Sequence, residues 1–335
     1  MARRADFFPM LISLTLTNFR GFANLDIPKL ARVNLIGGVN NAGKTSILEA
    51  IYLLLERDAG KIHDLPSVFR APSALDSERY FWKWIAKNRG DGSVTSISAQ
   101  FQPGSGVQVF ISLSSPLASA PGQLYVKLEN RSFSLKLFGG AHPQTLPGVS
   151  SFSPRPTDPT EDARVYTEAL AITLSNEEKI ESLVHEIDDR VKRVRPLADP
   201  KTNKSVLHVG LSSSETFPAT QLGQGFNRLL RIYSALFAAE AKVFLIDEIE
   251  TGLHHSVLPT IWKGLAAVAR QEDVQIFATT HSREAILAAH RVFSAEPQYD
   301  FAYHRLERDA TGDVQVVTYD QEALTGADEA NFEVR

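Results

Sequence analysis

Apolar and polar positions in the first part of the chain follow a strand pattern and then a helix pattern. Residues 11–19 alternate apolar side chains with Ser and Thr at a period of two, and a short turn leads into a second strand over residues 23–30. The apolar run over residues 33–36 predicts a buried strand that ends at a pair of glycines. Over residues 45–57 the apolar positions recur at helical spacing. A glycine-rich turn is therefore expected to join a buried strand to a helix.

The middle of the chain has a less regular pattern. Residues 58–90 show no clear period apart from a short helix predicted near residues 77–87. Residues 93–137 contain three runs rich in Val, Ile, Ser and Phe, which predict an antiparallel meander. Five prolines fall within residues 143–159, and this composition predicts an exposed linker or loop rather than a core element.

Helices and strands alternate from residue 160 onward. Residues 160–191 have helical spacing, with a capping box at Ser175-Asn176-Glu177-Glu178. The later pattern predicts two short strands within 192–222, helices over 225–240, 256–270 and after 282, strands over 242–246 and 274–279, and two strands and a short helix after 300. This alternation is typical of an α/β fold. We expect a split α/β body at residues 1–57 and 200–335, interrupted by an inserted region at 58–199 that holds the meander, the proline-rich loop and helices.

The composition excludes several classes of protein. The 335 residues are 43% hydrophobic and 22% charged, which rules out a chain that is disordered throughout. The chain has no cysteine, which excludes a disulfide framework and a thiolate metal site and makes a cytoplasmic location the expectation. The apolar stretch 229–246 is interrupted by Arg231, Glu240 and Lys242, so no membrane span is expected. The formal net charge of -4 leaves open whether a local basic surface binds nucleic acid.

The glycine-rich turn carries a phosphate-binding pattern. Residues 38–45 (GVNNAGKT) match a P-loop, placed between a predicted strand and a predicted helix as such a loop requires. Backbone N–H groups of the loop and of the helix N-terminus would bind phosphates, Lys44 is expected to reach the β- and γ-phosphates, and Thr45 is expected to hold Mg²⁺. The predicted nucleotide-binding residues of this segment are Gly38, Asn40, Asn41, Ala42, Gly43, Lys44, Thr45 and Ser46.

Two further segments place polar side chains at the ends of predicted strands. The strand over 242–246 ends in Asp247, placed to bind Mg²⁺, and Glu248, placed to orient or polarise an attacking water. The next buried strand ends at His281, where a contact to the γ-phosphate is needed, although a histidine at a strand end is more often structural. The predicted catalytic residues are Lys44, Glu248 and His281, and the predicted metal ligands are Thr45 and Asp247.

A glycine pair opens the helix that precedes the acidic strand, in the sequence Leu222-Gly223-Gln224-Gly225. With GVNNAGKT, VFLIDE, a D-loop-like segment at 250–254 and TTHS, it makes the chain resemble ABC-type, AAA-family ATPases of the RecF/SMC/OLD branch, most closely short bacterial members without a Toprim nuclease domain. The resemblance implies a P-loop NTPase of ABC-ATPase type, with a mixed sheet, flanking helices, an antiparallel β subdomain and a helical insertion. It also implies that two chains enclose ATP, so that Gly223, Gln224 and Gly225 contact it in trans and the chain forms a homodimer.

The chain departs from that family at a few positions. Gly223 stands where the family's signature has a serine, so a hydroxyl contact to the γ-phosphate is missing. Gln100 and Gln102 are candidates for the family's Q-loop glutamine, and the local pattern assigns that role to neither; Arg70 lies where related ATPases can place an arginine near the nucleotide. His254, which is followed by a second histidine, is assigned to the D-loop rather than to a metal site.

Three interpretations of the partner stay open. In the first, the ATPase acts with a separately encoded Toprim-type nuclease in anti-phage defence, because the sequence after His281 is too short for a Toprim domain. In the second it is a RecF-like repair ATPase that binds DNA, for which residues 192–195, Arg57 and Lys61 are candidate phosphate contacts. In the third it serves a membrane transporter, which the long insertion and the LGQG sequence disfavour. The aromatic segment 80–84 is either a stacking surface for bases or part of the packing.

Overall fold

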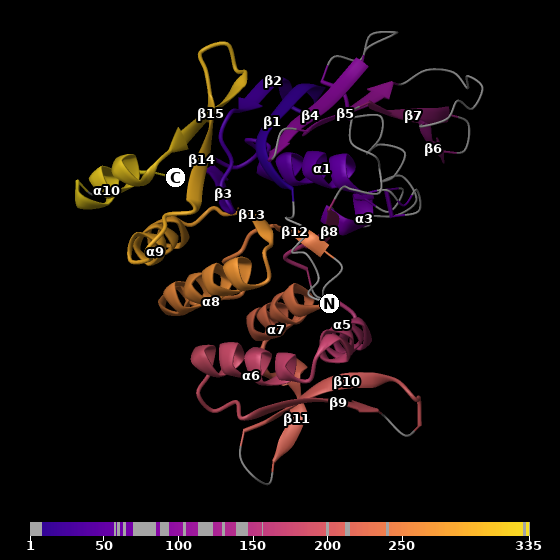
Figure 1. Ribbon diagram of the computed structural model, residues 1–335, viewed down its shortest axis with the longest axis vertical. Helices are drawn as coiled ribbons and strands as arrows, with labels where there is room; N and C mark the ends of the chain where they lie inside the picture. The colour runs from indigo at the N-terminus through magenta and orange to yellow at the C-terminus, as the bar shows by residue number, and fades with distance from the viewer. Residues whose placement is uncertain are drawn as a thin grey trace, which may run out of the picture.

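A computed structural model of the chain contains three sheets and the helices that cover them (Figure 1). The structure describes residues 9–56, 58, 61–62, 65–69, 85–87, 94–102, 105–112, 123–128, 131–138, 147–155, 157–198, 201–211, 215–238, 241–330 and 333–334. Within this part of the chain, none of the helices combines the length and the apolarity needed to cross a bilayer.

The sheet at the centre of the molecule is mostly parallel. Its strand order is β15-β14-β3-β13-β12-β8, and each neighbouring pair is parallel except β14 with β15. Every residue of β3 and β13 is buried. Because the carboxyl ends of parallel strands meet at one edge, the loops that follow β3, β8, β12 and β13 come together there. The strands are β3 (Val33–Gly38), β8 (Gly148–Phe152), β12 (Ala241–Ile246), β13 (Gln275–Thr279), β14 (Phe301–Arg308) and β15 (Val314–Tyr319).

A second sheet is antiparallel throughout and lies on the other side of α1 (Figure 1). Its order is β2-β1-β4-β5-β7-β6, with β1 (Met10–Phe19), β2 (Phe22–Ile27), β4 (Val94–Gln102), β5 (Ser105–Ser112), β6 (Gln123–Leu128) and β7 (Arg131–Phe138). Helix α1 (Lys44–Leu55) contacts strands of both sheets. Every residue of α1 except Thr45 is buried, as expected for a helix that is covered on all sides.

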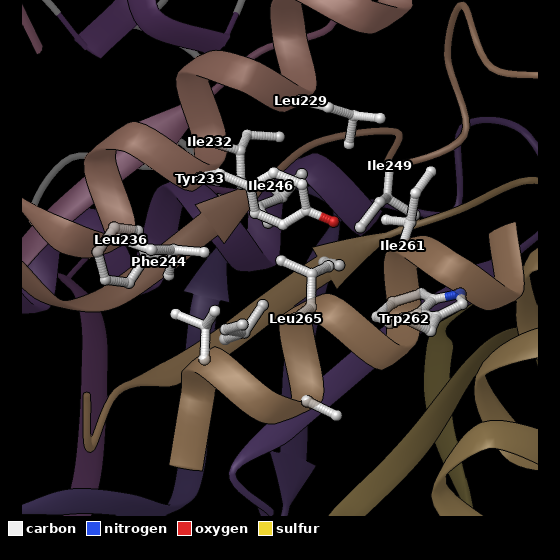
Figure 2. Packing of buried hydrophobic residues seen from close by; sticks show 14 of the residues in the cluster. Leu229, Ile232, Tyr233, Leu236, Phe244, Ile246, Ile249, Ile261, Trp262 and Leu265 are labelled. Carbon is white, nitrogen blue, oxygen red and sulfur yellow. The ribbon is translucent and has the colours of Figure 1, made fainter. Parts of the chain in front are cut away.

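A helical lobe packs against the far side of the parallel sheet. It consists of α5 (Pro159–Ile172), α6 (Ser175–Ile187) and α7 (Gln224–Phe237), together with the small antiparallel sheet of β9 (Arg193–Ala198), β10 (Ser205–Gly210) and β11 (Thr216–Pro218). Figure 2 shows apolar side chains of α7 packed with those of β12 and of α8 (Leu258–Gln271). Burying each of these large side chains contributes about 1.5–3 kcal/mol, so the start of α7 is held firmly relative to the end of β12.

The remaining helical elements are short or lie at the outer part of the parallel sheet. They are α3 (Leu65–Phe69), η2 (Ala219–Leu222), η3 (His255–Val257), α9 (Arg283–Ser294) and α10 (Gln321–Glu329). The strands predicted over 11–19 and 33–36, the helix that follows the glycine turn, and the alternating elements after residue 222 are confirmed.

Several expectations for the middle of the chain are wrong. The proline-rich stretch holds β8, whose pairing with β12 satisfies its backbone groups, and its last residue Phe152 is buried. The runs over 93–137 form four strands rather than three. Residues 85–87, at the end of the helix predicted near 77–87, are not helical: Ala86 forms an isolated bridge with Phe19 of β1, and its two neighbours are bends. The rest of that predicted helix lies outside the described residues.

Two local predictions in the helical lobe also fail. Residues 192–222 contain three strands rather than two, because a short third strand pairs with β10. The capping box at Ser175 does not form, since α6 begins at Ser175 and its N-cap is Leu174, which has no polar side chain. The Ser175 N–H donates instead to Thr173 Oγ1 at 3.4 Å, and α6 packs on α5 and α7.

The sheets cross the predicted domain boundaries. β4 belongs to the predicted insertion but pairs with β1 along most of its length, and β8 adds an edge to the parallel sheet. The predicted division into a split body and an inserted region, at residues 57/58 and 199/200, stays a prediction. In the structure, strands from both predicted parts share both large sheets.

Candidate nucleotide-binding site

The loop between β3 and α1 has the backbone that its glycines predict. Gly38 and Gly43 have φ of 129° and 100°, and Asn41 has φ of 60°. A Cβ at Gly38 would lie 2.5 Å from the Leu306 carbonyl oxygen, and one at Gly43 would lie 2.5 Å from the Phe22 ring. Both positions therefore need glycine for space as well as for backbone conformation. Asn40 and Asn41 are exposed at the tip of the loop, whereas Ala42 and Ser46 are buried.

Lys44 turns back into its own loop. Its Nζ donates to the carbonyl oxygens of Gly38 at 2.8 Å and Val39 at 3.0 Å, and lies 3.2 Å from Nδ1 of His281. The residue is only 5% exposed, and this burial lowers the pKa of its ammonium group to about 8, against the attraction of nearby carboxylates. A buried cation surrounded by carbonyl oxygens and backbone N–H groups is suited to bind an anion such as a phosphate.

Asp247 lies at the end of β12 and meets two hydroxyl groups. Thr45 Oγ1 is 3.2 Å from each carboxylate oxygen, and Thr279 Oγ1 donates to Oδ1 at 2.6 Å. Burial raises the pKa of Asp247, partly opposed by these two hydrogen bonds. A hydroxyl and a carboxylate at this spacing are hard oxygen donors of the kind that Mg²⁺ prefers, so the pair fits that ion.

Glu248 follows in a strained conformation. Its φ is 49°, a value that residues other than glycine rarely adopt, and its N–H donates to Thr279 Oγ1 at 2.8 Å. Oε2 accepts from Thr251 Oγ1 at 2.9 Å, and Oε1 lies 4.0 Å from Nε2 of His281. The side chains of Glu248 and His281 are 40% and 37% exposed, so water reaches both.

The predicted catalytic and metal-binding residues thus lie together through a chain of contacts. Lys44 meets His281, His281 meets Glu248, and Thr45 meets Asp247. Each comes from the carboxyl end of β3, β12 or β13, or from the first turn of α1. Residues more than 200 positions apart in the sequence meet because the three strands are neighbours in the parallel sheet.

Two residues that the sequence analysis gave no role support this cluster. Glu250 Oε1 accepts from the backbone N–H of His281 at 2.7 Å. The Arg228 guanidinium donates through Nη1 to the Glu248 carbonyl oxygen at 2.7 Å, and through Nη2 to that of Asp247. For Arg228 the sequence did offer a signal, which is an arginine on the face of α7 that meets β12.

The second glycine-rich loop has a different geometry. Gly223 is exposed with φ of 95°, and a Cβ added there would meet nothing within 4 Å in the described structure. Gln224 is exposed as well. Gly225 is buried, and a Cβ there would collide with the Gly252 carbonyl group. Gly225 therefore packs against the turn after Asp247, whereas Gly223 and Gln224 face outward.

The structure places the Q-loop candidates away from the P-loop cluster. Gln100 and Gln102 are exposed on β4, opposite Ser13 and Met10 of β1 in the antiparallel sheet. The segment next to the Asp247 end of β12 is the one after β8, where the Asp247 N–H donates to the Phe152 carbonyl oxygen at 2.8 Å. Three residues further on, burial lowers the pKa of Arg155 and the charge of Asp247 opposes this. Arg70, the arginine singled out by sequence, lies outside the described residues.

The basic segment 192–195 is largely neutralised by neighbouring groups. Arg193 donates to Glu181 at 3.0 Å, Arg195 pairs with Glu177 and Glu181, and Lys192 donates to the Asp189 carbonyl oxygen at 2.7 Å. Lys61 lies 4.0 Å from Glu56, while Arg57 and residues 80–84 lie outside the described residues. These pairs favour a structural role for the segment 192–195.

His254 acts as a helix cap in this structure. Its ring accepts from the Ser256 N–H at the start of η3. Among the described residues, no group of three or more His, Asp or Glu side chains is arranged to hold a metal ion. The hydrogen bond with Ser256 gives His254 a structural role at the start of η3.

Two family models match the chain. Residues 10–137 match a model described as "AAA ATPase domain", and residues 142–288 match one described as "AAA domain, putative AbiEii toxin, Type IV TA system". The first match includes the P-loop, and the second includes Asp247, Glu248 and His281.

Individual proteins and solved structures are also similar to this chain. An "ATP/GTP phosphatase" of Helicobacter pylori is 24% identical over 340 residues, which cover 88% of this chain and 90% of that protein. The "DNA replication and repair protein RecF" of Idiomarina loihiensis is 48% identical over 42 residues, 12% of either chain. An SMC head solved with the C-winged helix domain of ScpA matches with a TM-score of 0.62 and 12% identity, covering 95% of this chain and 100% of that chain. The SMC head domain from Thermotoga maritima matches with a TM-score of 0.50 and 12% identity, covering 92% and 99%.

The fold and the matched motifs define an ABC-type P-loop ATPase with the architecture of SMC heads, which confirms the predicted fold class. The two matched models are both AAA ATPase domains, which is consistent with the RecF/SMC/OLD-like resemblance of the motifs.

Proposed function

We propose that the chain hydrolyses ATP in a Mg²⁺-dependent reaction at the cluster around Lys44. The observation that carries this proposal is the set of contacts that joins Lys44, Thr45, Asp247 and His281 at one edge of the parallel sheet. Thr45 and Asp247 would hold Mg²⁺, which neutralises phosphate charge when bound. The loop's N–H groups and Lys44 would bind the phosphate chain.

Glu248 is the proposed general base. Its carboxylate is partly exposed and held by Thr251, so it can accept a proton from a water that attacks the γ-phosphate. His281, 4.0 Å from that carboxylate and 3.2 Å from Lys44 Nζ, would orient the γ-phosphate or the water between them. Arg228 and Glu250 are positioning residues, because they hold the backbone on which Glu248 and His281 lie.

We further propose that ATP brings two chains together as a homodimer. The outward-facing loop at Gly223 and Gln224 opens a helix of 14 residues, whose N-terminus attracts anions. In a symmetric dimer this loop of one copy would contact the γ-phosphate held by the P-loop of the other copy. Since Gly223 has no hydroxyl group, backbone N–H groups would make that contact, and hydrolysis would be slow.

The proposed role of the ATP cycle is to control a protein partner, with a separate Toprim-type nuclease in anti-phage defence as the first candidate. The similar SMC head was solved with a winged-helix domain of ScpA on it, which supports the idea that this ATPase body carries a second protein. The glutamates that pair with Arg193 and Arg195 offset part of the positive charge of this candidate DNA contact, which supports a protein partner over DNA. A cytoplasmic location is part of this proposal.

A RecF-like role in DNA repair is the second candidate, supported by the local match to RecF over 42 residues. The two roles differ in their response to DNA. Stimulation of ATP hydrolysis by double-stranded DNA, declining steeply between about 50 and 200 mM salt, would favour the RecF-like role. Unchanged hydrolysis with DNA would favour the protein partner.

The test of the proposed function begins with the purified full chain. ATP hydrolysis is measured with Mg²⁺ and with EDTA, and molar mass is measured by light scattering with and without ATP for wild type and Glu248→Gln. We expect hydrolysis only with Mg²⁺ and a doubled mass for Glu248→Gln in ATP. Capture of bound proteins from the native host by the ATP-trapped Glu248→Gln dimer would then identify the partner. Hydrolysis that is equally fast in EDTA, or a monomer under all conditions, would contradict the proposal.

A further inference from the structure

A cavity of about 300 Å³ lies beside the Asp247 end of β12. Its walls come from the segment after β8, the first turn of α5, the start of α7 and the turn at Thr251-Gly252. Among the residues that the structure describes, three arginines and one aspartate line it: Arg155, Arg228, Arg231 and Asp162. A cavity in which cationic side chains outnumber carboxylates concentrates anions.

Arg228 lines this cavity and is anchored to the backbone beside it. Its two terminal nitrogens bind the carbonyl oxygens of Glu248 and Asp247, whereas its Nε is buried and has no hydrogen-bond partner among the described residues. Each terminal nitrogen of a guanidinium group carries two N–H groups, so each keeps one N–H for a further acceptor after these bonds.

Arg231, one turn further along α7, is in a similar position. Its guanidinium lies over the Phe152 ring at 5.5 Å, and its Nε is 3.4 Å from Asp162 Oδ1 without forming a hydrogen bond within the described structure. Asp162 is already engaged, since its two oxygens accept from Thr157 Oγ1 at 2.7 and 3.0 Å. Burial raises the pKa of Asp162, while the hydrogen bond from Thr157 and the charge of Arg231 oppose this shift. Guanidinium groups thus outnumber carboxylates among the described residues that line the cavity, while Asp247, Glu248 and Glu250 act on Arg228 from outside that lining.

We propose that this cavity binds a tetrahedral oxyanion, and that its ligand is the inorganic phosphate released by hydrolysis. Guanidinium groups bind phosphate oxygens in pairs, and this chemistry matches the donors of Arg228 and Arg231. Arg228 holds the carbonyl oxygens of the two residues where ATP would be cleaved, so the cavity adjoins the place where phosphate forms. The inference rests on the proposed ATP hydrolysis for the origin of the phosphate, whereas the site itself needs no nucleotide.

Phosphate binding is best measured on nucleotide-free protein by equilibrium dialysis with labelled inorganic phosphate. Lys44→Ala serves as the background, because the P-loop is a second phosphate site and this change weakens it. In that background, Thr220→Glu places a carboxylate in the wall of the cavity at an exposed position. Thr202→Glu makes the same change at an exposed position in the turn between β9 and β10, away from the cavity.

We expect the background protein and Thr202→Glu to bind one phosphate with equal affinity, and Thr220→Glu to bind it at least about tenfold more weakly. Arg231→Lys, which keeps the charge but loses the paired donors, should also weaken binding. Sulfate should compete with phosphate, and chloride at equal ionic strength should not. Equal affinity in Thr220→Glu and Thr202→Glu, or no phosphate bound in the background protein, would overturn the proposal.

A phosphate group of a bound nucleotide could occupy the cavity in place of inorganic phosphate, because both present tetrahedral phosphate oxygens. If ADP binds the Lys44→Ala background more tightly than phosphate does, and loses that affinity in Thr220→Glu, then released phosphate is not the ligand. Because no step of this test needs turnover, its result is separate from that of the hydrolysis experiment. If the chain hydrolyses ATP but has no phosphate site that Thr220→Glu weakens, phosphate binding by the cavity is refuted and the proposed hydrolysis still stands.

Discussion

Two helices of this chain begin at glycines, and the loops before them differ in what they can do. Before α1, Gly38 and Gly43 are packed against neighbouring residues, and Lys44 fills the loop with a buried charge. Before α7, Gly223 has a similar positive φ but borders open space. Both helix N-termini attract anions. Only the first loop adds a lysine, a threonine hydroxyl and the carboxylates of β12 within one set of contacts.

The surroundings of the two helices explain this difference. α1 is buried between two sheets, so the side chains of its first turn meet the ends of three parallel strands. α7 buries one face on β12 and α8 and leaves the outer side of its first residues exposed. We infer that the loop before α1 holds a nucleotide by itself, whereas the loop before α7 acts on a nucleotide that another copy holds.

Replacing Glu248 should have the largest effect. Glu248→Gln removes the proposed base but keeps the loop before α1, so we expect turnover to fall by about 10²–10⁴-fold while ATP binding persists. Steady-state phosphate release and binding of a fluorescent ATP analogue measure the two quantities. Glu322→Gln, at an exposed position on α10, is the matched control and should leave both unchanged. Normal turnover in Glu248→Gln would remove the assignment of the base.

Replacing Lys44 tests the loop before α1 directly. Lys44→Ala removes a charge-assisted contact worth about 1.5–3 kcal/mol, so ATP affinity should fall by roughly 10–150-fold. The same titration of Lys263→Ala, an exposed lysine on α8, should match wild type. If Lys44→Ala binds ATP as tightly as Lys263→Ala does, the loop before α1 is not the nucleotide site.

A mixing experiment tests whether the loop before α7 acts in trans. Gln224→Glu places a negative charge on that loop without the packing damage expected at Gly225, and each homodimer of Gln224→Glu or of Lys44→Ala should hydrolyse ATP poorly. An equal mixture forms some mixed dimers with one intact composite site, so about a quarter of wild-type activity should return. A mixture of Lys44→Ala with Gln321→Glu, exposed on α10, shows the activity reached when the loop before α7 is intact. Absence of any gain on mixing would place both loops on the same nucleotide or exclude the dimer.

The last prediction concerns the stability of the strands behind the loop before α1. His304 on β14 is fully buried, with Nδ1 3.0 Å from Thr318 Oγ1 and Nε2 3.3 Å from Asn34 Oδ1, and burial lowers its pKa to about 4. The unfolded chain takes up this proton near pH 6.5, whereas the folded chain takes it up only near pH 4. The free energy of unfolding should therefore fall as the pH drops from about 6.5 to 4, by up to about 3 kcal/mol from this group.

Urea unfolding at pH 7 and pH 5 measures that loss. In His304→Gln the part of the loss that comes from this histidine should disappear, whereas His255→Gln, at an exposed position, should keep it. The same acid sensitivity in both variants would show that other groups cause it.

Much of the fold could be predicted because its signals are local. A period of two predicted β1, a continuous apolar run predicted β3, and helical spacing predicted α1 and α7. β8 was missed because its segment contains prolines and few apolar residues, and its strand conformation depends on pairing with β12, almost a hundred residues away. The helix predicted near 77–87 fails at residues 85–87 for the same reason, since pairing with β1 overrides the local pattern there.

The residues of the candidate site also differ in whether the sequence could identify them. Lys44, Thr45, Asp247, Glu248 and His281 could be named from motifs, because each lies at a strand end or helix start that short patterns identify. Arg155, Arg228 and Glu250 could not be given roles, since each acts through contacts with the backbone or charge of distant segments. Gly225 looked like an anion-binding glycine, and only its contact with Gly252 shows that it is needed for packing.

The amino-acid order alone therefore specifies the P-loop, the acidic strand end and the class of ATPase, because glycine conformation, helix capping and side-chain chemistry act over a few residues. The tertiary structure decides which strands are neighbours, which arginines line the cavity beside Asp247, and which glycine-rich loop faces outward. Those outcomes depend on burying apolar faces of segments that lie far apart in the chain. Such burial is a property of the whole fold, and no short sequence pattern encodes it.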